Sequence, residues 1–335
     1  MKSSHHKPPL ALIILIDLLL AGAGLVVFAL FHHVLPRDIQ ITGESLARPT
    51  TTLNEPLTTT LPSSPDSETS PSASEPLTPE TTAARGLWGA KFADRFTDGE
   101  IIVTENSYRS ENIAIIVEKV EKDEVTYYVA DIILRDIEYF RTAFAGGSYA
   151  RGRTDDVLDM AAENGAILAI TGDYYGIRDK GVVIRNGELF RSSTFEDVLI
   201  MYYDGSMQTL TEEAFDIETV RTSGAWQAWS FGPMLLDGGQ VMREFNSNVT
   251  PPNPRSAIGY YEPGHYCFVL VDGRQEGYSI GLTLRQMSQL FFDLGCQVAY
   301  NLDGGQSAVM TLMGTIVNQP YRDGRAVSDI IYIGE

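Results

Sequence analysis

The chain has 335 residues, of which 44% are hydrophobic and 21% charged, a composition that excludes a disordered or fibrous protein. Its formal net charge is −19. Residues 87–335 carry 20 basic and 36 acidic side chains, a net charge of −16, so we expect no nucleic-acid partner. An anionic substrate would need a local cluster of arginines to overcome the negative electrostatic potential of this domain.

Residues 10–31 form the first predicted element, an almost entirely apolar helix. At about 1.5 Å per residue, such a helix spans the hydrocarbon core of a bilayer. Lys2 and Lys7 precede it, so the N-terminus is expected in the cytoplasm and the C-terminal part outside it. The run is longer than the apolar core of a signal peptide and lacks a small-x-small cleavage site. We therefore assign residues 1–34 to a cytoplasmic N-terminus and a single-pass cell-membrane anchor, with a cleaved signal peptide as the alternative.

Residues 35–86 form the second predicted segment. From residue 45 onward it is rich in Thr, Ser and Pro and has few apolar side chains that a core would bury. This composition predicts a flexible, partly extended stalk that holds a folded domain away from the membrane.

Residues 87–335 are predicted to form one extracytoplasmic α+β domain with mixed β-sheets and a few helices. Turn dipeptides such as Asn186-Gly187 separate short β-type runs. The predicted strands cover residues 111–117, 125–134, 181–184, 198–203, 267–271, 298–302 and 330–333. Helices are predicted over 154–164, after a capping Thr, and over 283–294, where apolar residues recur at helical spacing.

Two segments share the order helix, glycine, apolar strand, aspartate, namely 165–173 and 295–303. Both place Asp eight residues after Gly, with an Ala at the same offset. We interpret them as related units that deliver Asp173 and Asp303 to one cleft. Chance is the alternative, because Gly, Ala and Asp are common residues.

The residue types available for chemistry are limited. His265 is the one histidine after residue 86, which excludes a His-rich zinc site. Neither a P-loop nor a complete G-x-S-x-G elbow is present. Cys267 and Cys296 lack a metal-type spacing, so we predict two buried thiols, with a disulfide as the alternative. Carboxylates and arginines are left to act; no cofactor is expected, and nothing in the sequence specifies a metal.

Four loops combine glycine with aspartate or arginine. They are 172–176 (GDYYG), 254–259 (PRSAIG), 272–275 (DGRQ) and 301–307 (NLDGGQS). In this order, the loops resemble those of the phosphodiester glycosidase family, the uncovering-enzyme-like domain whose bacterial relatives are described as exopolysaccharide-biosynthesis proteins. The resemblance runs from Ile167 to the C-terminus.

The sequence departs from the family pattern at two positions. Thr171 stands where the first turn usually has Asn, and Gln306 stands where a third glycine often follows. Both positions lie where a backbone would approach a sugar, so they bear on which glycan binds more than on the type of reaction.

The resemblance implies hydrolysis of a sugar-1-phosphate phosphodiester in a cell-surface glycan or exopolysaccharide. Asp303 would serve the anomeric centre, with Asp173 as its partner carboxylate. Arg255 and Arg274 would hold the phosphate through their planar forks. A departing phosphate monoester has a second pKa of about 6, so arginine rather than a dedicated general acid would suffice to stabilise it.

Further side chains of the same loops are candidates for substrate binding. Tyr174 and Tyr175 would stack on a sugar face, and consecutive glycines would let main-chain amides approach an anion. The remaining candidates are Gly172, Ser256, Gly304, Gly305, Gln306 and Ser307. The rival interpretation is a non-catalytic glycan-binding or assembly module of an envelope polysaccharide system, and the third is an ordinary glycosidase whose substrate lacks phosphate.

Overall fold

The structure is a computed structural model that describes residues 10–29, 42–48 and 87–335. The chain divides into two units, Met1–Ile39 and Gln40–Glu335. The first contains helix α1 (Leu10–Ala29), inside the predicted anchor. Among the described residues, no helix meets the length and apolarity needed to cross a membrane, so the predicted span is not confirmed.

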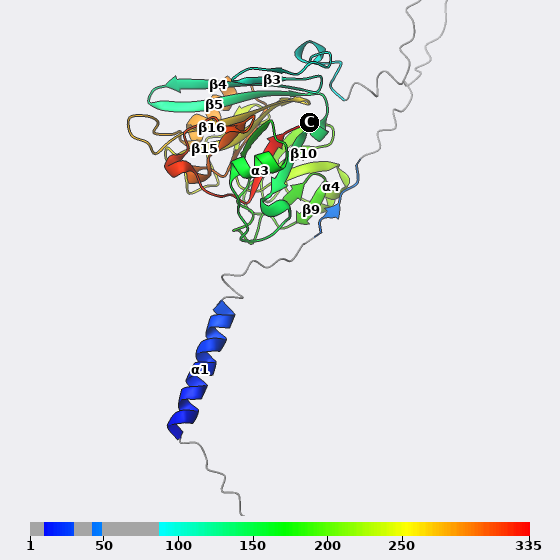
Figure 1. Cartoon of the computed structure of the whole chain (residues 1–335). Coiled ribbons are helices and arrows are strands. Elements are labelled where there is room, and N and C mark those ends of the chain that lie inside the picture. The colour runs from blue at the N-terminus through cyan, green and yellow to red at the C-terminus, as the bar shows by residue number, and fades with distance from the viewer. Residues whose placement is uncertain (1–9, 30–41, 49–86) are drawn as a thin grey trace, which may run out of the picture. The chain divides into compact units, whose positions relative to one another are not determined.

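Three antiparallel sheets make up the second unit (Figure 1). Sheet A has the order β1 (Glu44–Ser45), β9 (Glu188–Arg191), β8 (Val183–Arg185), β12 (Ala225–Trp229), β10 (Val198–Tyr202), β11 (Met207–Leu210). Sheet B has the order β14 (Gln240–Val241), β13 (Met234–Asp237), β17 (Val298–Leu302), β15 (Arg255–Glu262), β16 (His265–Val271), β5 (Val125–Leu134), β4 (Ile113–Lys122), β3 (Ser107–Arg109), β2 (Ile102–Val103). Sheet C has the order β19 (Thr315–Ile316), β18 (Met310–Leu312), β7 (Leu168–Thr171), β20 (Asp329–Ile333), β6 (Phe140–Phe144).

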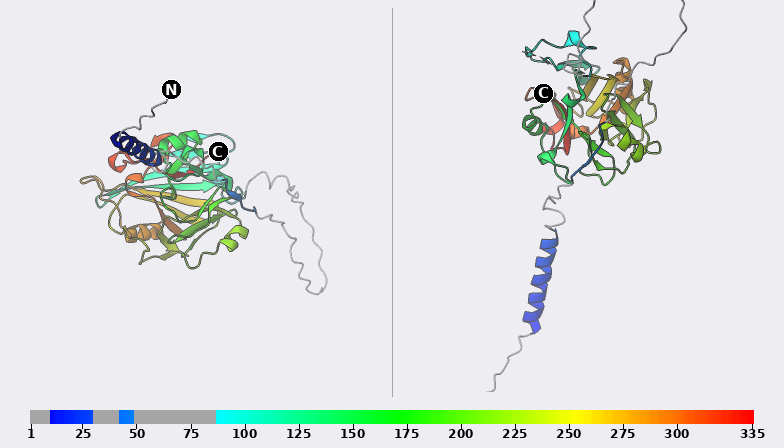
Figure 2. Two further views of the ribbon diagram at one scale, coloured as in Figure 1. Left: turned by 90° about the horizontal axis from the view of Figure 1, so that it is seen from below. Right: turned by 90° about the vertical axis from the view of Figure 1, so that its right-hand side faces the viewer.

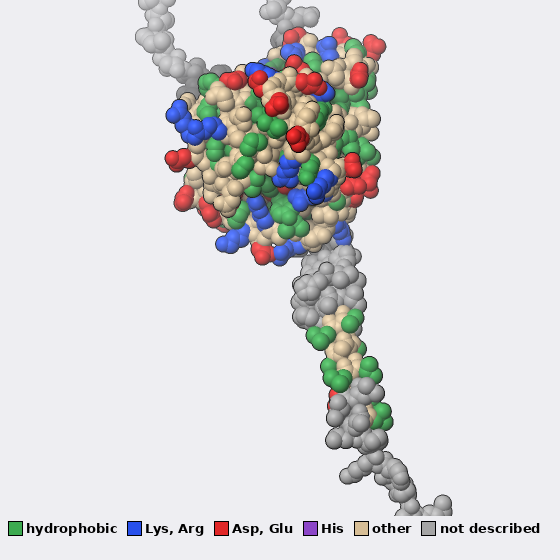
Figure 3. All heavy atoms as spheres, turned by 90° about the vertical axis from the view of Figure 1, so that its left-hand side faces the viewer, with side chains coloured by type: hydrophobic (Ala, Val, Ile, Leu, Met, Phe, Trp, Pro, Cys, Tyr) green, Lys and Arg blue, Asp and Glu red, His purple; other side chains and the backbone are tan. Residues whose placement is uncertain are grey.

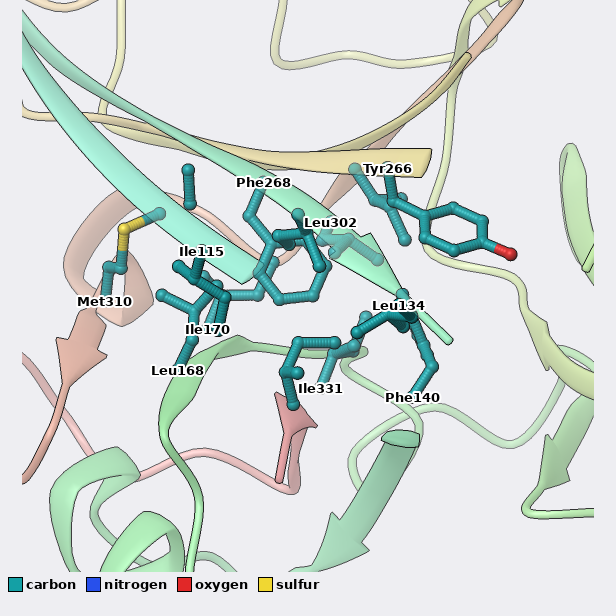
Figure 4. Packing of buried hydrophobic residues seen from close by; sticks show 14 of the residues in the cluster. Ile115, Leu134, Phe140, Leu168, Ile170, Tyr266, Phe268, Leu302, Met310 and Ile331 are labelled. Carbon is teal, nitrogen blue, oxygen red and sulfur yellow. The ribbon is translucent and has the colours of Figure 1, made fainter. Parts of the chain in front are cut away.

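The main core lies between sheets B and C. Alternate side chains of β4, β5, β16 and β17 face those of β6, β7, β18 and β20 across it (Figure 4). Phe268 and Leu302 come from sheet B, whereas Ile170 and Ile331 come from sheet C, and all four are buried. Figure 2 shows the long strands of sheet B in two further orientations.

Helices cover the outer faces of these two sheets. α5 (Leu284–Asp293) packs on sheet B through Leu284, Met287 and Phe291. Its N-cap Thr283 and Gln286 form a reciprocal capping box, which satisfies two amides that the first helical turn leaves without partners. α3 (Val157–Glu163) packs on sheet C, and a third short helix, α4 (Ile217–Thr222), contacts β12 of sheet A.

The predicted α+β class is confirmed, and most predicted strands occur. The predictions over 125–134 and 298–302 coincide with β5 and β17. The first predicted helix is shorter than expected: α3 begins after Asp156 rather than Thr154. The sequence prediction omitted α4 and several strands, including β12 and β15. Every strand pairing among the described residues is antiparallel, a more uniform arrangement than the expected mixed sheets.

Part of the predicted stalk belongs to the folded unit. Residues 42–48 include β1, which pairs with β9, and Leu46 is buried. The stalk prediction is therefore corrected for this segment, while residues 35–41 and 49–86 lie outside the described part of the chain.

The two cysteines are buried free thiols. The Sγ atoms of Cys267 and Cys296 lie 3.7 Å apart. Burial raises the pKa of Cys267 well above its ordinary value. The prediction of two buried thiols is therefore confirmed.

The domain surface carries both signs of charge. In Figure 3, Lys and Arg side chains are interspersed with Asp and Glu side chains over the face shown. The domain surface therefore carries basic side chains locally, despite the net negative charge of the chain.

Candidate functional site

Asp173 and Asp303, predicted to share a cleft, do lie together. Asp173 follows β7 and Asp303 follows β17, and both are buried. The amide of Asp303 donates to the carbonyl of Gly172 at 3.1 Å, which joins the ends of the two strands. Each strand follows a helix and a glycine with positive φ, Gly165 or Gly295, as the repeat predicted.

Asp303 is bordered by a serine and an arginine. Arg325 approaches the carboxylate at 3.3 Å and donates from Nε to the Ser307 hydroxyl at 2.6 Å. Burial raises the pKa of Asp303, Ser307 and Arg325 act in the opposite direction, and Asp173 adds to the rise. The site thus holds a buried carboxyl whose ionised form depends on one partly exposed arginine.

Arg274 lies against Gly305 of the Gly304-Gly305 turn. Its Nε donates to Asn253 Oδ1 at 2.9 Å, and its guanidinium lies 5.6 Å from the centre of the Tyr321 ring. Both Nη atoms face Gly305, where an added Cβ would stand 3.3 Å from the nearer one. Gly305 has φ of 63°, so this close approach and the backbone both favour glycine. The exposed Nη atoms of Arg274 form no hydrogen bond within the described residues and are available to an anion.

The amides of the glycine turn are largely engaged. Those of Asp303, Gly305 and Ser307 donate to backbone carbonyls at 3.1, 2.9 and 3.1 Å. The expectation that consecutive glycine amides bind the anion is thereby corrected at Gly305. The side chains of Arg274, against Gly305, and of Arg325, against Asp303, are also placed to bind an anion.

Asp173 is held by several donors. Its Oδ1 accepts from the amide of Tyr174 at 2.6 Å, and its Oδ2 accepts from the amide of Ser230 at 3.1 Å. Arg185 lies 3.6 Å from the same Oδ2. Asp173 is therefore placed to shape the site and to influence Asp303, since both of its oxygens already have protein donors.

A second buried carboxylate, Asp329, supports Asp173 from behind. Arg185 donates to Asp329 at 2.8 Å, and Asp329 accepts from the amide of Asp173 at 2.7 Å. Burial raises the pKa of Asp329, and Arg185 opposes the rise. A Cβ at Gly172 would stand 2.5 Å from Asp329 Oδ1, so only glycine fits in front of this carboxylate.

Arg255 does not present its predicted fork to a phosphate. On β15 it shares the face of Ala257, which packs under α5, whereas Ile258 faces the core between the sheets. Its Nε donates to the carbonyl of Leu282 at 3.1 Å and its Nη2 to two carbonyls of the 249–251 loop at 2.8 Å. Burial lowers the pKa of Arg255 to about 10, and Arg274 adds to this. Arg255 therefore organises two loops.

Two more predicted ligands are buried structural residues. The Ser256 hydroxyl donates to the carbonyl of Thr171 at 3.2 Å, and Ser256 has no exposed surface. Tyr175 is 1% exposed and stacks on Tyr149 with ring centroids 5.1 Å apart. By contrast, Tyr174 is half-buried, and the Arg325 guanidinium lies 5.4 Å from its ring centre. Of the two tyrosines, Tyr174 alone is placed to meet a sugar.

The two departures from the family pattern have structural roles. The Thr171 hydroxyl donates to the carbonyl of Ser307 and accepts from the amide of Val309 at 3.3 Å. The side-chain amide of Gln306 donates from Nε2 to the carbonyl of Gly324 at 2.8 Å. This hydrogen bond ties the glycine turn to the loop that carries Arg325. Gln306 thus positions an arginine.

Sequence reasoning missed Arg325, Arg185 and Asp329. For Arg325 a signal was available, because it follows Asp323-Gly324 as Arg274 follows Asp272-Gly273. For the other two no sequence signal exists, since their contact joins β8 and β20 of different sheets. Among the described residues, no group of three or more His, Cys, Asp or Glu side chains is arranged to hold a metal ion.

Comparisons with known proteins place the chain in a family. A family model described as phosphodiester glycosidase matches residues 164–334. The chain is 29% identical over 193 residues to an uncharacterized prophage-derived protein of Bacillus subtilis, covering 53% of this chain and 29% of that protein. It is 23% identical over 216 residues to the N-acetylglucosamine-1-phosphodiester alpha-N-acetylglucosaminidase of Bos taurus, covering 58% and 37%. The chain thus spans less than two fifths of either relative.

A solved structure supports the fold. The catalytic domain of the zebrafish N-acetylglucosamine-1-phosphodiester alpha-N-acetylglucosaminidase aligns with a TM-score of 0.54 at 22% identity, covering 67% of this chain and 83% of that one. The family model, which accounts for the C-terminal half of the sequence, confirms the resemblance inferred from the four loops. The chain belongs to the phosphodiester glycosidase family.

Proposed function

We propose that the unit Gln40–Glu335 hydrolyses a sugar-1-phosphate phosphodiester between the anomeric carbon and the phosphate oxygen. The observation that carries the proposal is the arrangement around Asp303. This carboxylate follows β17, with Ser307 and Arg325 against it, and Arg274 lies against Gly305 two residues further along the chain. A carboxylate with one arginine beside it and another on the same turn matches a substrate that has an electrophilic carbon next to a phosphate.

The chemistry follows from these positions. Arg274 and Arg325 bind the phosphate oxygens and stabilise the charge that develops as the bond to the anomeric carbon breaks. Asp303 stabilises the positively charged anomeric centre or activates the incoming water. The oxygen of water joins the anomeric carbon, and the phosphate monoester leaves with the bonding electron pair. Asp173 and Asp329 hold this end of the two strands in place.

Arg325 takes the role that the sequence suggested for Arg255. Its side chain is 43% exposed, and it contacts Asp303, Ser307 and the Tyr174 ring. Arg255 instead donates to carbonyls on the α5 face of sheet B. Substitution of Arg325, rather than of Arg255, is therefore expected to lower the activity.

The substrate belongs, in this proposal, to a cell-surface glycan or exopolysaccharide. Support comes from the sequence, in which an apolar run with lysines before it precedes the domain and indicates single-pass anchoring with the domain outside the cytoplasm. Protease protection in intact cells tests this orientation: the domain should be digested from outside while the N-terminus stays protected.

The activity is tested with residues 40–335 and a panel of phosphodiesters of N-acetylglucosamine, glucose, galactose and mannose. We expect release of free sugar from at least one. Matched methyl glycosides, which lack the phosphate, should release none, and hydrolysis of these would indicate an ordinary glycosidase. Binding across the panel without turnover would instead favour the non-catalytic glycan-binding module.

Replacing Asp303 by Asn keeps the shape of the side chain and removes its charge. We expect sugar release to fall at least 1,000-fold, on the order of the loss of an essential catalytic group, with little change in melting temperature. Arg255→Lys, which keeps a cation on the other face of the sheet, should retain most of the activity. Full activity of the Asp303→Asn variant would refute the assignment.

A further inference from the structure

A cluster of five side chains gathers around Arg178 and includes Tyr174, whose ring also lies near Arg325 of the site. This rim cluster consists of Tyr174, Arg178, Phe195, Glu196 and Phe231. The Arg178 guanidinium lies 4.5 Å from the ring centre of Phe195, 4.9 Å from that of Phe231 and 6.0 Å from that of Tyr174. Its Nη1 also donates to the carbonyls of Ser230 and Phe231, so the cluster has a fixed centre.

The register of sheet B brings this cluster to Asp303. β13 pairs antiparallel with β17, with Met234 opposite Tyr300. The amide of Asn301 donates to the carbonyl of Pro233 at 3.1 Å, and its side chain donates to the carbonyl of Gly232 at 2.9 Å. Because the two chains run in opposite directions, the residues before β13 lie beside the residues after β17. Gly232 therefore lies beside Asn301, two residues before Asp303 in the chain, and Phe231 precedes Gly232.

Glu196 is held close to the same place. One carboxylate oxygen lies 3.3 Å from the position of a Cβ added to Gly232. The next residue, Asp197, is buried and accepts from the amide of Met234 at 3.0 Å. Glu196 has φ of 55°, a left-handed conformation that few non-glycine residues adopt. Strain of this kind concentrates at ligand sites, where the surrounding structure enforces it.

The Glu196 carboxylate has no hydrogen-bond partner among the described residues, although it is half-buried beside Arg178. An ionised carboxylate can only accept hydrogen bonds, through two oxygens. Aromatic faces with a few convergent polar groups are typical of small-molecule sites. Tyr174 links the rim cluster to the Asp303 site, since the guanidinium groups of both Arg178 and Arg325 lie over its ring.

We propose that the rim cluster binds the sugar ring of the phosphodiester, and that Glu196 accepts hydrogen bonds from its ring hydroxyls. The substrate class is then a phosphodiester of an uncharged pyranose, because an acceptor-only carboxylate recognises hydroxyl groups and repels a sugar carboxylate. Glu196 acts in this assignment as a specificity residue. The inference rests on the proposed hydrolysis at Asp303 but concerns recognition of the sugar.

The test compares wild type and Glu196→Ala on the best substrate of the panel and on analogues that each lack one ring hydroxyl. Wild type should lose about 10- to 100-fold in kcat/KM on at least one analogue, as expected when a hydrogen bond to a charged group is removed. Glu196→Ala should be weakened on the parent sugar and lose that discrimination. Glu118→Gln, on the exposed side of β4, is the matched control.

The outcomes separate recognition from catalysis. If wild type is active and Glu196→Ala discriminates among the analogues as wild type does, the inference is overturned and the proposed activity stands. If no phosphodiester is hydrolysed, the proposed activity fails. Saturation-transfer NMR with the sugar 1-phosphates then decides the inference: binding that Glu196→Ala weakens supports it, and binding that it leaves unchanged overturns it.

A second inference concerns residues 42–48, the strap segment. β1 pairs with the outer strand β9, and the amide of Leu46 donates to the carbonyl of Gly187 at 2.8 Å. Leu46 is 6% exposed and packs in a core of sheet A with Ile184 and Leu189. The strap segment therefore completes sheet A and covers an edge that would otherwise have unpaired backbone groups.

Side chains fix both ends of the strap segment. Glu44 pairs with Arg221 at 3.1 Å, and Arg48 pairs with Glu138 at 2.9 Å. The Arg48 guanidinium also lies 5.5 Å from the ring centre of Tyr203. Exposed pairs of this kind contribute little energy, so the buried Leu46 and the strand pairing provide most of the attachment.

We infer from this attachment where the folded unit begins in the chain. The Thr/Ser/Pro-rich residues 49–86 begin and end on the same folded unit, because the strap segment precedes them and Trp88, whose amide donates to the carbonyl of Arg135, follows. The folded unit therefore begins before residue 49, so residues 49–86 do not separate α1 from it in the sequence. A cut between residues 49 and 86 would leave the domain bound to the N-terminal part of the chain.

A specific protease site inserted between Ser64 and Pro65 of the full chain tests this. After complete cleavage, shown on a denaturing gel, we expect the two pieces to co-migrate on a native gel. Leu46→Asp, which places a charge in the core of sheet A, should release the N-terminal piece, whereas Glu44→Gln should not. Separation of the wild-type pieces under native conditions would overturn the inference.

Discussion

At Asp303, burial and charge act on the carboxyl pKa in opposite directions. Burial raises it, and Ser307 and Arg325 oppose the rise. A carboxyl that must be ionised to act loses activity as the pH falls through its pKa in the folded protein. The raised pKa therefore moves the acid limb of the activity profile above the range of an ordinary aspartate.

Replacing Arg325 by Met removes the cation that favours ionised Asp303. We expect the acid limb of the kcat/KM profile to move to higher pH. At neutral pH, kcat/KM should fall about tenfold or more through the lost phosphate contact. The pH dependence of sugar release measures both effects. Arg109→Met, on β3, should leave the profile unchanged, and an unshifted limb in Arg325→Met would show that another group controls the acid limb.

The adjacent tyrosines Tyr174 and Tyr175 are expected to differ in function. Tyr174→Ala removes a ring next to Arg325 and should raise KM roughly tenfold, since stacking and cation–π contacts contribute about 1–2 kcal/mol. Tyr175→Phe should leave KM unchanged, because that ring packs on Tyr149. Steady-state kinetics decide between these roles, and a raised KM in Tyr175→Phe would contradict the buried assignment.

Among the elements, β8 and β20 are linked by a buried ion pair between sheets A and C. Arg185 of β8 contacts Asp329 of β20 at 2.8 Å, and both side chains are almost fully buried. The link fixes Asp173, and with it the end of β7. The pKa of Asp329 is raised above its unfolded value, so its ionisation lowers stability as the pH rises through the carboxyl range.

Arg185→Met leaves two buried carboxylates without their cation. We expect the free energy of unfolding to fall by about 3–5 kcal/mol at pH 7. The loss should be smaller at pH 5, because protonation neutralises a carboxyl whose pKa is raised further. Urea denaturation at the two pH values measures this, and the double variant Arg185→Met with Asp329→Asn should recover part of the stability. An equal loss at both pH values would mean that lost packing dominates.

For the whole molecule, the folded unit begins before the segment where composition changes. Residues 42–48 contribute a strand and a buried leucine to sheet A, although in sequence they lie well before Leu87, where the next described segment begins. A domain boundary drawn at residue 87 therefore removes part of a sheet.

A fragment of residues 87–335 should be less stable than one of 40–335. Burial of a leucine contributes about 1.5–3 kcal/mol, and for a domain of this size each kcal/mol shifts the melting temperature by about 2–4 °C. Differential scanning calorimetry of both fragments tests the difference, and Leu46→Ala in 40–335 should fall between them. Equal melting temperatures would show that the strap segment adds nothing to stability.

The sequence by itself determined features that depend on local patterns. Apolar residues at helical spacing predicted α5, and alternating or continuous apolar runs predicted β5 and β17. The repeated order of glycine, strand and aspartate predicted the pairing of Asp173 with Asp303. These predictions succeeded because helical and strand periodicity and strand-end loops are set by residues close together in the chain.

The tertiary structure alone decided which arginine lies beside Asp303. The sequence suggested Arg255 and not Arg325, but strand alternation and the neighbours of β15 turn Arg255 toward α5, while Gln306 ties the loop of Arg325 to the glycine turn. The attachment of β1 to β9 and the contact of Arg185 with Asp329 likewise join residues more than 100 positions apart. Such contacts depend on how the sheets pack against one another, which no local pattern specifies.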